Sequence, residues 1–343
     1  MSKSELKGIS VAIIGAGISG LSCATQLKAL GYQVQLYEKS RGVSGRMSTR
    51  NEESWTLDHG AQYFTARDPL FIEELNNWID AKVAAIWNPR LKVFKNNQWQ
   101  DSASQENRYV GIPAMNSPGK YLAKNLPLAL TQTINQITYY QDKWHLHSLE
   151  QGDIEQQYDW LVLALPAPQS LALAQSIDKS IEMLATQANM QGCWTVMASF
   201  TENLNLPFDA AFINNEIISW ISRNNSKPNR PGPETWIIHA NPQWSQKWIE
   251  LDKAEAAKLI LACAKRLGLD CDKAKISIHR WRYASGHTNS PLGFSLQEDL
   301  KIGFCGDWLN GGRVEGAWLS GYKLASQINS VNNSTYRSEH HDN

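Results

Sequence analysis

The chain has 343 residues, 42% of them hydrophobic, and its 33 basic and 33 acidic residues leave a formal net charge of zero. This length favours two lobes over a single core, and the absence of net charge disfavours nucleic acid and membrane surfaces as partners. Five scattered cysteines without a Cys-x-x-Cys pair exclude the common zinc and disulfide frameworks, so no metal site is predicted. No apolar run reaches the roughly 18 residues of a membrane span, and we expect a soluble, cytoplasmic protein.

The N-terminal forty residues follow a strand–helix–strand pattern. Residues 9–14 form an apolar, β-branched run typical of a buried parallel strand. Residues 18–30 carry apolar side chains at helical spacing, and Gly31 is a natural stop. Residues 33–38 then predict a second short strand. This order is that of a βαβ dinucleotide-binding unit.

The remainder of the chain mixes helix and strand patterns. We predict helices at 71–82, 117–130, 170–188, 252–267 and 314–328. We predict strands at 91–94, 133–139, 144–149, 159–165, 276–281 and 301–305, and mainly strands across 192–240. A polar loop rich in chain breakers interrupts that region at 224–233.

A glycine-rich turn joins the first strand to the first helix and matches G-x-G-x-x-G. In this motif Gly15 permits the tight turn, Gly17 lets a pyrophosphate approach the backbone, and Gly20 lets helix and strand pack closely. The helix N-terminus offers free N–H groups and a positive dipole end. Glu38 ends the second strand, where its carboxylate can accept both ribose hydroxyls. The predicted ligands here are Gly15, Ala16, Gly17, Ile18, Ser19, Gly20 and Glu38; the alternative is a glycine turn with a surface glutamate.

The loop and the acid alone do not distinguish NAD from FAD. A second loop follows Glu38, and its basic and small residues place positive charge and bare backbone beside a pyrophosphate. Its candidate ligands are Lys39, Arg41, Gly45 and Arg46. An NAD dehydrogenase needs no such loop, although a basic, solvated turn would have the same composition.

A third segment near the C-terminus completes the case for FAD. A strand ends in Gly306-Asp307, which offers a carboxylate to hydroxyls of the ligand, and a glycine-rich turn then opens a helix. The positive end of that helix would stabilise negative charge on a reduced flavin. Candidate ligands here are Gly306, Asp307, Glu315, Gly316 and Ala317; the alternative is a loop and helix with a capping acid.

Seven segments together resemble the flavin amine-oxidase superfamily, and within it the renalase branch, particularly its bacterial members. They are GAGISG, LYEKSRGVSGRMSTR, DHGAQYFT, RYVGIPAM, LVLALPAPQ, HRWRYA and GDWLNGGRVEGAWLSG. The similarity runs in order from Ile9 to about Gln327. The superfamily's usual R-x-G-G-R loop is longer here, with Ser44 in place of one glycine.

The resemblance implies further cofactor residues. Gly60, Ala61, Gln62 and Tyr63 would pass along the isoalloxazine, the backbone of Ile137 would pair with adenine, and Ala164 would border the cofactor. His59 stands where the family often has an apolar residue. No cysteine is placed like a covalent flavin attachment, so noncovalent FAD is expected.

Three residues are candidates for the substrate side, where they form the predicted catalytic group. His239 ends a strand, and renalase-like proteins carry a similar W-x-x-H-A segment at the flavin face. Trp281 and Tyr283 alternate along another strand, so one face of it would present two aromatic walls to a planar ring. All three could equally be packed core residues.

These observations predict an α/β fold with two domains. The Rossmann-type FAD-binding domain is built from discontinuous segments, 1–70, 109–168 and 276–330. A second domain with an antiparallel sheet and helices comprises 71–108 and 169–275, and a disordered tail spans 331–343.

The predicted activity is that of an FAD-dependent oxidoreductase. The resemblance implies that it oxidises 2- or 6-dihydro-NAD(P) isomers to NAD(P)+ by hydride transfer to flavin N5, with O2 as acceptor giving H2O2. The alternatives are a flavin oxidase acting on a small amine, a desaturase-like relative, or a redox-inert FAD-binding protein.

Overall fold

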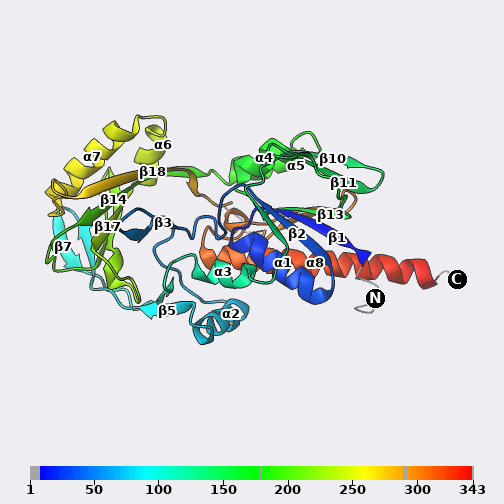
Figure 1. Ribbon diagram of the computed structural model, residues 1–343, viewed down its shortest axis with the longest axis horizontal. Helices are drawn as coiled ribbons and strands as arrows, with labels where there is room; N and C mark the ends of the chain where they lie inside the picture. Colours follow the sequence, from blue (N-terminus) through cyan, green and yellow to red (C-terminus); the bar gives the residue numbers. More distant parts are fainter. Residues whose placement is uncertain (1–7, 178, 289–291, 342–343) are drawn as a thin grey trace.

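Two large sheets organise the chain into two lobes (Figure 1), in a computed structural model that describes residues 8–177, 179–288 and 292–341. The first is a six-stranded sheet in the order β19-β20-β13-β1-β2-β9. Its strands are β1 (Ser10–Ile14), β2 (Gln33–Glu38), β9 (Leu128–Leu130), β13 (Trp160–Leu163), β19 (Ser295–Gln297) and β20 (Ile302–Phe304). All neighbours pair in parallel except the edge strand β19, which is antiparallel to β20.

Both faces of this parallel sheet are covered, as its continuous apolar strands require. Helices α1 (Ile18–Leu30) and α8 (Val314–His341) pack together on one face. Gly321 allows their close crossing, because a Cβ there would stand 2.0 Å from the Ser19 carbonyl oxygen. The other face carries helices α4 (Ala167–Ala174) and α5 (Ser180–Gln187). Beside these helices lies a three-stranded antiparallel sheet of β10 (Ile134–Tyr140), β11 (Lys143–Ser148) and β12 (Gly152–Asp153).

The second large sheet has seven strands in the order β18-β14-β17-β16-β15-β6-β7. They are β6 (Leu91–Lys95), β7 (Gln98–Asp101), β14 (Gln191–Phe200), β15 (Ala210–Ile213), β16 (Ile218–Arg223), β17 (Glu234–Ala240) and β18 (Lys275–Ser285). Helix α7 (Lys253–Arg266) covers one face, where its apolar side packs on β14 and β17, and α6 (Pro242–Lys247) lies beside β14. The opposite face meets the small hairpin of β3 (Thr49–Asn51) and β4 (Thr56–Asp58).

Several shorter elements complete the structure. They are α2 (Pro69–Asp80), β5 (Ala84–Trp87), β8 (Arg108–Gly111), α3 (Ser117–Ala123) and the single 3-10 turns at Asn224–Ser226 and Asp307–Leu309. Among helices of the described residues, none combines the length and the apolar character that crossing a bilayer requires.

The predicted α/β architecture is confirmed, with three differences in detail. The predicted helix at 117–130 ends at Ala123, because Pro127 cannot continue it, and residues 128–130 instead extend the first sheet as β9. The tail expected to be disordered is helical as far as His341, since no glycine or proline interrupts α8 after Gly321; residues 342 and 343 lie outside the described part. Strand β18 belongs to the second sheet, although residues 276–330 were assigned to the cofactor domain.

Helices α4 and α5 show the converse difference. The sequence predicts that residues 169–275 belong to the second domain. Both helices instead pack on the first sheet through buried residues such as Ala174 and Ile181. The chain therefore crosses between the lobes after α5, and it returns through β18. Beyond these segments, the predicted division into domains stays a prediction.

Candidate cofactor and substrate site

The glycine turn has the geometry that its sequence predicts. Gly15 adopts φ +103°, and a Cβ there would stand 2.6 Å from the Ala164 carbonyl oxygen. A Cβ on Gly20 would stand 2.0 Å from the Gly15 carbonyl oxygen. Gly17, by contrast, has no atom within 4 Å of a Cβ position. The turn is tightly packed on its inner side and open at Gly17, as the approach of a pyrophosphate requires.

Glu38 is buried directly beneath this turn. One carboxylate oxygen accepts a hydrogen bond from the Ala16 N–H at 2.8 Å, and the other accepts from the Ser40 N–H at 2.8 Å. Each carboxylate oxygen can accept a second bond, so the group retains capacity for two ribose hydroxyls. The structure thus brings the predicted ribose acid to the predicted phosphate turn.

The second predicted loop packs against the first. The Ser44 N–H donates to the Ala16 carbonyl at 2.9 Å, and a Cβ on Gly45 would stand 3.3 Å from the Gly17 Cα. Ser44 itself takes φ +87°, and its hydroxyl donates to the Asn116 carbonyl at 3.0 Å. The hydroxyl of the residue that replaces the family glycine therefore anchors the loop to the start of α3.

Arg46 joins this loop to the C-terminal segment. Its guanidinium donates to both carboxylate oxygens of Asp307, at 2.6 and 3.0 Å, and to the Ala284 carbonyl at 3.1 Å. The Gly306 N–H donates in turn to the Ser320 hydroxyl. The two predicted ligands Arg46 and Asp307 thus neutralise each other, and they fix the end of β20 beside the phosphate loops.

Three more predicted ligands lie at or near the start of α8. The buried Glu315 carboxylate accepts from the N–H groups of Arg67 and Asp68, at 2.6 and 2.7 Å, so it holds the chain ahead of α2. A Cβ on Gly316 would stand 1.9 Å from the Asn310 carbonyl oxygen. Ala317 follows in the same turn and is half-buried. These contacts within the protein explain why position 315 is a glutamate and position 316 a glycine.

The segment from Asp58 to Gln62 passes next to these loops. The Ala61 N–H donates to the Arg46 carbonyl at 2.9 Å, and the His59 N–H to the Ser48 carbonyl at 3.3 Å. Gly60 is required here, because a Cβ would stand 2.0 Å from the Arg46 carbonyl oxygen. The predicted flavin-side segment and the predicted phosphate-side loop are therefore in direct contact.

The side chain of Gln62 is fully engaged within the protein. Its amide nitrogen donates to the carbonyls of Asp58 and Gly60, at 2.6 and 3.0 Å. Its amide oxygen accepts from the Ser222 hydroxyl at 3.1 Å and from the Lys227 ammonium at 3.0 Å. An amide group offers two donors and two acceptor sites, so none is left for a ligand.

Sequence reasoning missed a buried charge cluster that we call the Asp58 cluster: Asp58, Lys227 and Arg230. One carboxylate oxygen of Asp58 accepts from Lys227 at 3.1 Å and from Arg230 at 2.8 Å, and all three side chains are at most 3% exposed. Burial raises the pKa of Asp58, but the charges of Lys227 and Arg230 outweigh it and hold the pKa at about 2. Burial lowers the pKa of Lys227 to about 8 against the opposing charge of Asp58.

Next to this cluster lies a group of three imidazoles, the histidine cluster: His59, His239 and His279. Thr195 on β14 pairs with His239 on β17 and with His279 on β18. The side chains of Thr195, His239 and His279 therefore lie on the same face of the sheet. His59 stacks on Trp281 at 5.0 Å between ring centroids and meets His279 edge-on at 5.0 Å. Sequence reasoning missed His279, although strand alternation places it on the face of Trp281.

All three histidines are held neutral. Burial lowers the pKa of His59 to about 3, and of His239 and His279 to about 4. Nearby positive charges act in the same direction, Arg50 on His59 and His279 and Lys227 on His239. His59 Nδ1 and His239 Nε2 are buried, and neither has a hydrogen-bond partner among the described residues. Two buried imidazole nitrogens are thus left without a hydrogen-bond partner among the described residues.

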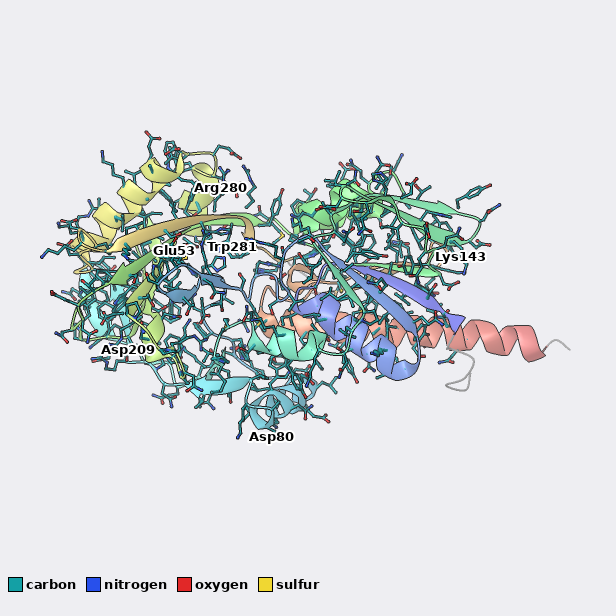
Figure 2. The ribbon with its side chains drawn as sticks, viewed as in Figure 1. Glu53, Asp80, Lys143, Asp209, Arg280 and Trp281 are labelled. Carbon is teal, nitrogen blue, oxygen red and sulfur yellow. The ribbon has the colours of Figure 1, made fainter. Side chains whose placement is uncertain are left out.

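The predicted aromatic walls lie on the same strand. Trp281 donates its indole N–H to the His59 carbonyl at 3.1 Å, and it lies toward the end of β18 that faces the first lobe (Figure 2). Tyr283 is half-buried two residues further on, while Arg282 lies exposed and pairs with Glu250. The alternation predicted for this strand is therefore present, and Trp281 packs against the histidine cluster.

Four predicted ligands have a less direct place. Lys39 and Arg41 are exposed beside Glu38. Tyr63 is half-buried and tilts toward Trp220 at 5.6 Å. Ile137 lies within β10, whereas Gln132 is the residue whose N–H donates to the Glu38 carbonyl. The adenine contact of Ile137 stays a prediction.

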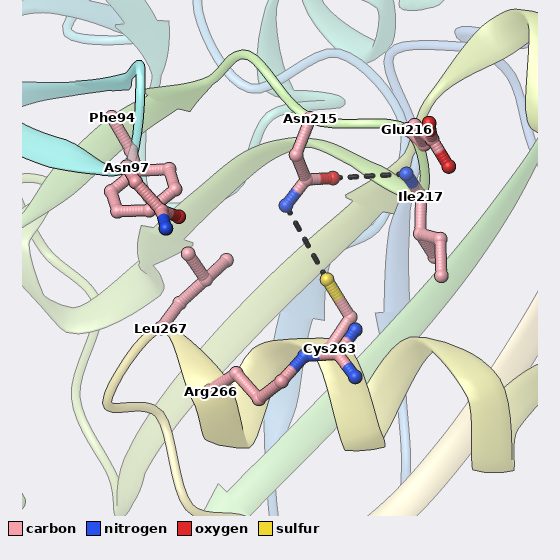
Figure 3. Close-up of a pocket in the computed structure, with 8 residues that line it drawn as sticks. All are labelled: Phe94, Asn97, Asn215, Glu216, Ile217, Cys263, Arg266 and Leu267. Carbon is pink, nitrogen blue, oxygen red and sulfur yellow. Dashed lines mark hydrogen bonds between the residues drawn. The ribbon is translucent and has the colours of Figure 1, made fainter.

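Two pockets lie away from this site. One, of about 280 Å³, is formed by α7, the turn before β16 and the β6–β7 hairpin (Figure 3). In it the Asn215 amide donates to Cys263 Sγ at 3.3 Å and accepts from the Ile217 N–H at 2.9 Å. The other, of about 400 Å³, lies on the three-stranded sheet. Neither is lined by a predicted site residue, and among the described residues no His, Cys, Asp and Glu group of three or more could hold a metal ion.

Comparison with known proteins gives a family match at the N-terminus. A model described as an NAD(P)-binding Rossmann-like domain matches residues 13–75. A 4,4'-diapophytoene desaturase (4,4'-diaponeurosporene-forming) of Staphylococcus haemolyticus is 44% identical over 50 residues, and that of Staphylococcus aureus strain Newman is 36% identical over 52. Each match covers 15% of this chain and 10% of the desaturase. The chain therefore resembles only about a tenth of the length of these desaturases.

Solved structures match over almost the whole chain. An Exiguobacterium sp. 255-15 protein assigned as a protoporphyrinogen oxidase has a TM-score of 0.74 at 12% identity, over 94% of this chain and 98% of its own. Putrescine oxidase with bound putrescine has 0.71 at 12% identity, over 94% and 99%. Cyclohexylamine oxidase from Brevibacterium oxydans IH-35A has 0.69 at 14% identity, over 93% and 98%. The chain therefore shares the fold of these oxidases over almost its whole length, and its residues 13–75 match a Rossmann-like NAD(P)-binding domain.

Proposed function

We propose that this protein is an FAD-dependent oxidoreductase that binds FAD noncovalently. The observation that carries the proposal is the convergence of four separate segments: the open turn at Gly17, Glu38 beneath it, the Ser44–Arg46 loop and the Gly306–Asp307 strand end. NAD would leave the last two without a role. The fold it shares with several oxidases supports the same conclusion.

The chain's own residues would divide the binding between them. Glu38 accepts ribose hydroxyls, the α1 N-terminus and the bare backbone at Gly17 receive the pyrophosphate, and the 59–61 backbone borders the ring. When bound, FAD supplies the hydride acceptor. The protein contributes orientation and electrostatics, so no residue needs to act as a nucleophile.

For the substrate we propose a dihydronicotinamide reduced at the 2- or 6-position. The histidine cluster favours it over a small amine, because its imidazoles are neutral and the charges acting on them are mostly positive. Asp58, a carboxylate that acts on His59, is already paired with Lys227 and Arg230. A flat, uncharged ring can stack on Trp281, and its carboxamide can bond to neutral imidazole nitrogen. A protonated amine would find no free carboxylate there among the described residues.

The alternative substrate is a small amine. Putrescine oxidase and cyclohexylamine oxidase share the fold and carry amines in their names, which is the observation in its favour. It requires the amine to lose its proton before it enters the site. The desaturase match covers only 50 residues and 10% of the desaturase, so it supports no substrate.

Anaerobic rapid mixing tests both the cofactor and the substrate. We expect a yellow protein whose flavin is released by acid or heat. The 2- or 6-dihydro-NAD(P) isomers should bleach it within seconds, with recolouring by air. Ordinary 4-dihydro-NAD(P)H and simple amines should react much more slowly. Bleaching by amines and not by the isomers would establish the alternative, and a colourless protein that takes up NAD but no FAD would refute the cofactor assignment.

A further inference from the structure

None of the binding roles proposed above belongs to the Asp58 cluster, yet its Lys227 bonds to Gln62 of the predicted flavin-side segment. Lys227 and Arg230 come from the loop after β16, far in sequence from Asp58 at the end of β4. Fully burying a lysine is costly unless the ammonium group is paired and hydrogen-bonded. A loop of this polar composition would ordinarily lie in solvent. The burial of the Lys227 and Arg230 side chains within this loop calls for an explanation.

Lys227 is connected to the flavin-side segment through one intermediary, the side chain of Gln62. Its ammonium donates to the Gln62 amide oxygen at 3.0 Å, while the Gln62 amide nitrogen donates to the carbonyls of Asp58 and Gly60. Without Lys227 the Gln62 amide would lose its strongest partner, because hydrogen bonds to charged groups are about twice as strong as neutral ones. The turn that carries Gly60 would then lose its fixed shape.

The cluster also has an excess of positive charge. Lys227 and Arg230 are two cations bonded to the same carboxylate oxygen of Asp58. The other oxygen of Asp58 is occupied by the Thr49 hydroxyl and the Met115 N–H. No second carboxylate contacts either cation among the described residues. Lys227 is close enough to His239 to act on it electrostatically, so its charge reaches the face where the substrate is proposed to bind.

We propose that Lys227 is a positioning residue of the candidate flavin site: it holds the 58–60 backbone through Gln62, and it places an unneutralised positive charge behind that backbone. The inference rests on the proposed function for its second part only. A flavin gains negative charge on reduction, so a nearby positive charge favours the reduced form. At about 10 Å and an effective dielectric constant of about 20, one unit charge changes an equilibrium roughly ten-fold.

Two substitutions separate the two parts of the inference. Lys227→Met removes both the hydrogen bond and the charge. Lys227→Gln removes the charge but keeps an N–H donor for Gln62. Lys143→Met is the matched control, because Lys143 also pairs with one aspartate, Asp159, but lies half-exposed in the other lobe.

Hydrogen exchange of the apoprotein tests the positioning without any cofactor. In Lys227→Met, peptides covering 57–64 should exchange at least ten-fold faster than in wild type, while β14 serves as the internal reference for global stability. Lys227→Gln should restore most of the protection, and Lys143→Met should change nothing at 57–64. Wild-type exchange at 57–64 in Lys227→Met would overturn the positioning role.

The midpoint potential of bound FAD tests the charge. Both Lys227 variants should lower the equilibrium constant for two-electron reduction about ten-fold, so the midpoint potential should fall by about 30 mV. Lys143→Met should leave the midpoint potential unchanged. An unchanged potential in Lys227→Gln with FAD bound would overturn the electrostatic role. If wild type binds no FAD, the proposed function and the electrostatic part fall together, whereas the exchange experiment still decides the positioning role.

Discussion

Replacing Asp58 with asparagine is the sharpest test of how this site is held together. Asparagine keeps the shape of the side chain and can still accept from the Thr49 hydroxyl and the Met115 N–H. It removes the only carboxylate that contacts Lys227 and Arg230 among the described residues. The variant therefore leaves two cations buried without a counter-charge, and such a loss is strongly destabilising.

The structure sets the size of the effect. The pKa of Asp58 is held at about 2, against an ordinary value of 3.8, which corresponds to about 2 kcal/mol of stability from ionisation alone. Breaking a buried ion pair by removing one partner costs about 3–5 kcal/mol in total. With an unfolding entropy of about 2 cal/mol/K per residue over 343 residues, the melting temperature should fall by about 4–7 °C.

Thermal unfolding followed by circular dichroism measures this loss. Because the folded-state pKa is depressed, the stabilisation is fully present above about pH 4 and is lost as the pH falls through 2, so the two proteins should converge at low pH. Asp101→Asn is the control, since Asp101 is 87% exposed in its pair with Lys92 and should cost at most about 1 kcal/mol. A loss below 1 kcal/mol in Asp58→Asn at pH 7 would refute the account of the cluster.

Three further predictions concern the cofactor and substrate. Glu38→Ala should weaken FAD binding about ten- to a hundred-fold in titrations of apoprotein, since it removes hydrogen bonds to a charged acceptor, and equal affinity would remove Glu38 from the site. Gly20→Ala should destabilise the apoprotein by about 1–3 kcal/mol in chemical unfolding, because its Cβ meets a carbonyl oxygen, whereas Gly17→Ala should fold normally and lose FAD affinity; the reverse order would contradict the turn geometry. His239→Asn should slow flavin bleaching in rapid mixing more than it weakens FAD binding, and equal losses would assign His239 to the cofactor instead.

The Rossmann unit was predictable because its determinants are local. Buried strands, a glycine turn and a carboxylate at the next strand end all fall within thirty residues, and each acts through backbone geometry that the sequence dictates. The parallel sheet followed from the recurrence of short apolar strands. The same reasoning overextended one helix, because periodicity alone outweighed the proline at 127.

The Asp58 cluster was not predictable by such reasoning. Its members are 169 and 172 residues apart, and the loop at 224–233 has the composition of a solvated turn. Charged residues in a polar loop are normally exposed, so no local pattern distinguishes Lys227 and Arg230 from surface residues. Only the three-dimensional pairing with Asp58 shows that they are buried.

Glu315 and Gln62 illustrate a different limit. The sequence pattern predicts that both lie beside the cofactor, and their polar atoms bond to the protein. A motif identifies which residues gather at a site without stating which of them face the ligand. The direction of a side chain depends on partners elsewhere in the chain, which a motif does not contain.

One charge that acts on the candidate site, that of Lys227, comes from outside the recognisable motifs. Arg46 and Asp307 lie within the motifs and cancel each other. Arg50 also lies within a motif and is paired with Glu52, whereas Lys227, which acts on His239, lies outside the motifs and shares the one carboxylate of Asp58 with Arg230. Two proteins with identical cofactor motifs could thus differ in the charge their substrate face presents, and hence in whether they accept a neutral ring or a cationic amine. For this chain the excess is positive, which is why the neutral ring is the substrate class we propose.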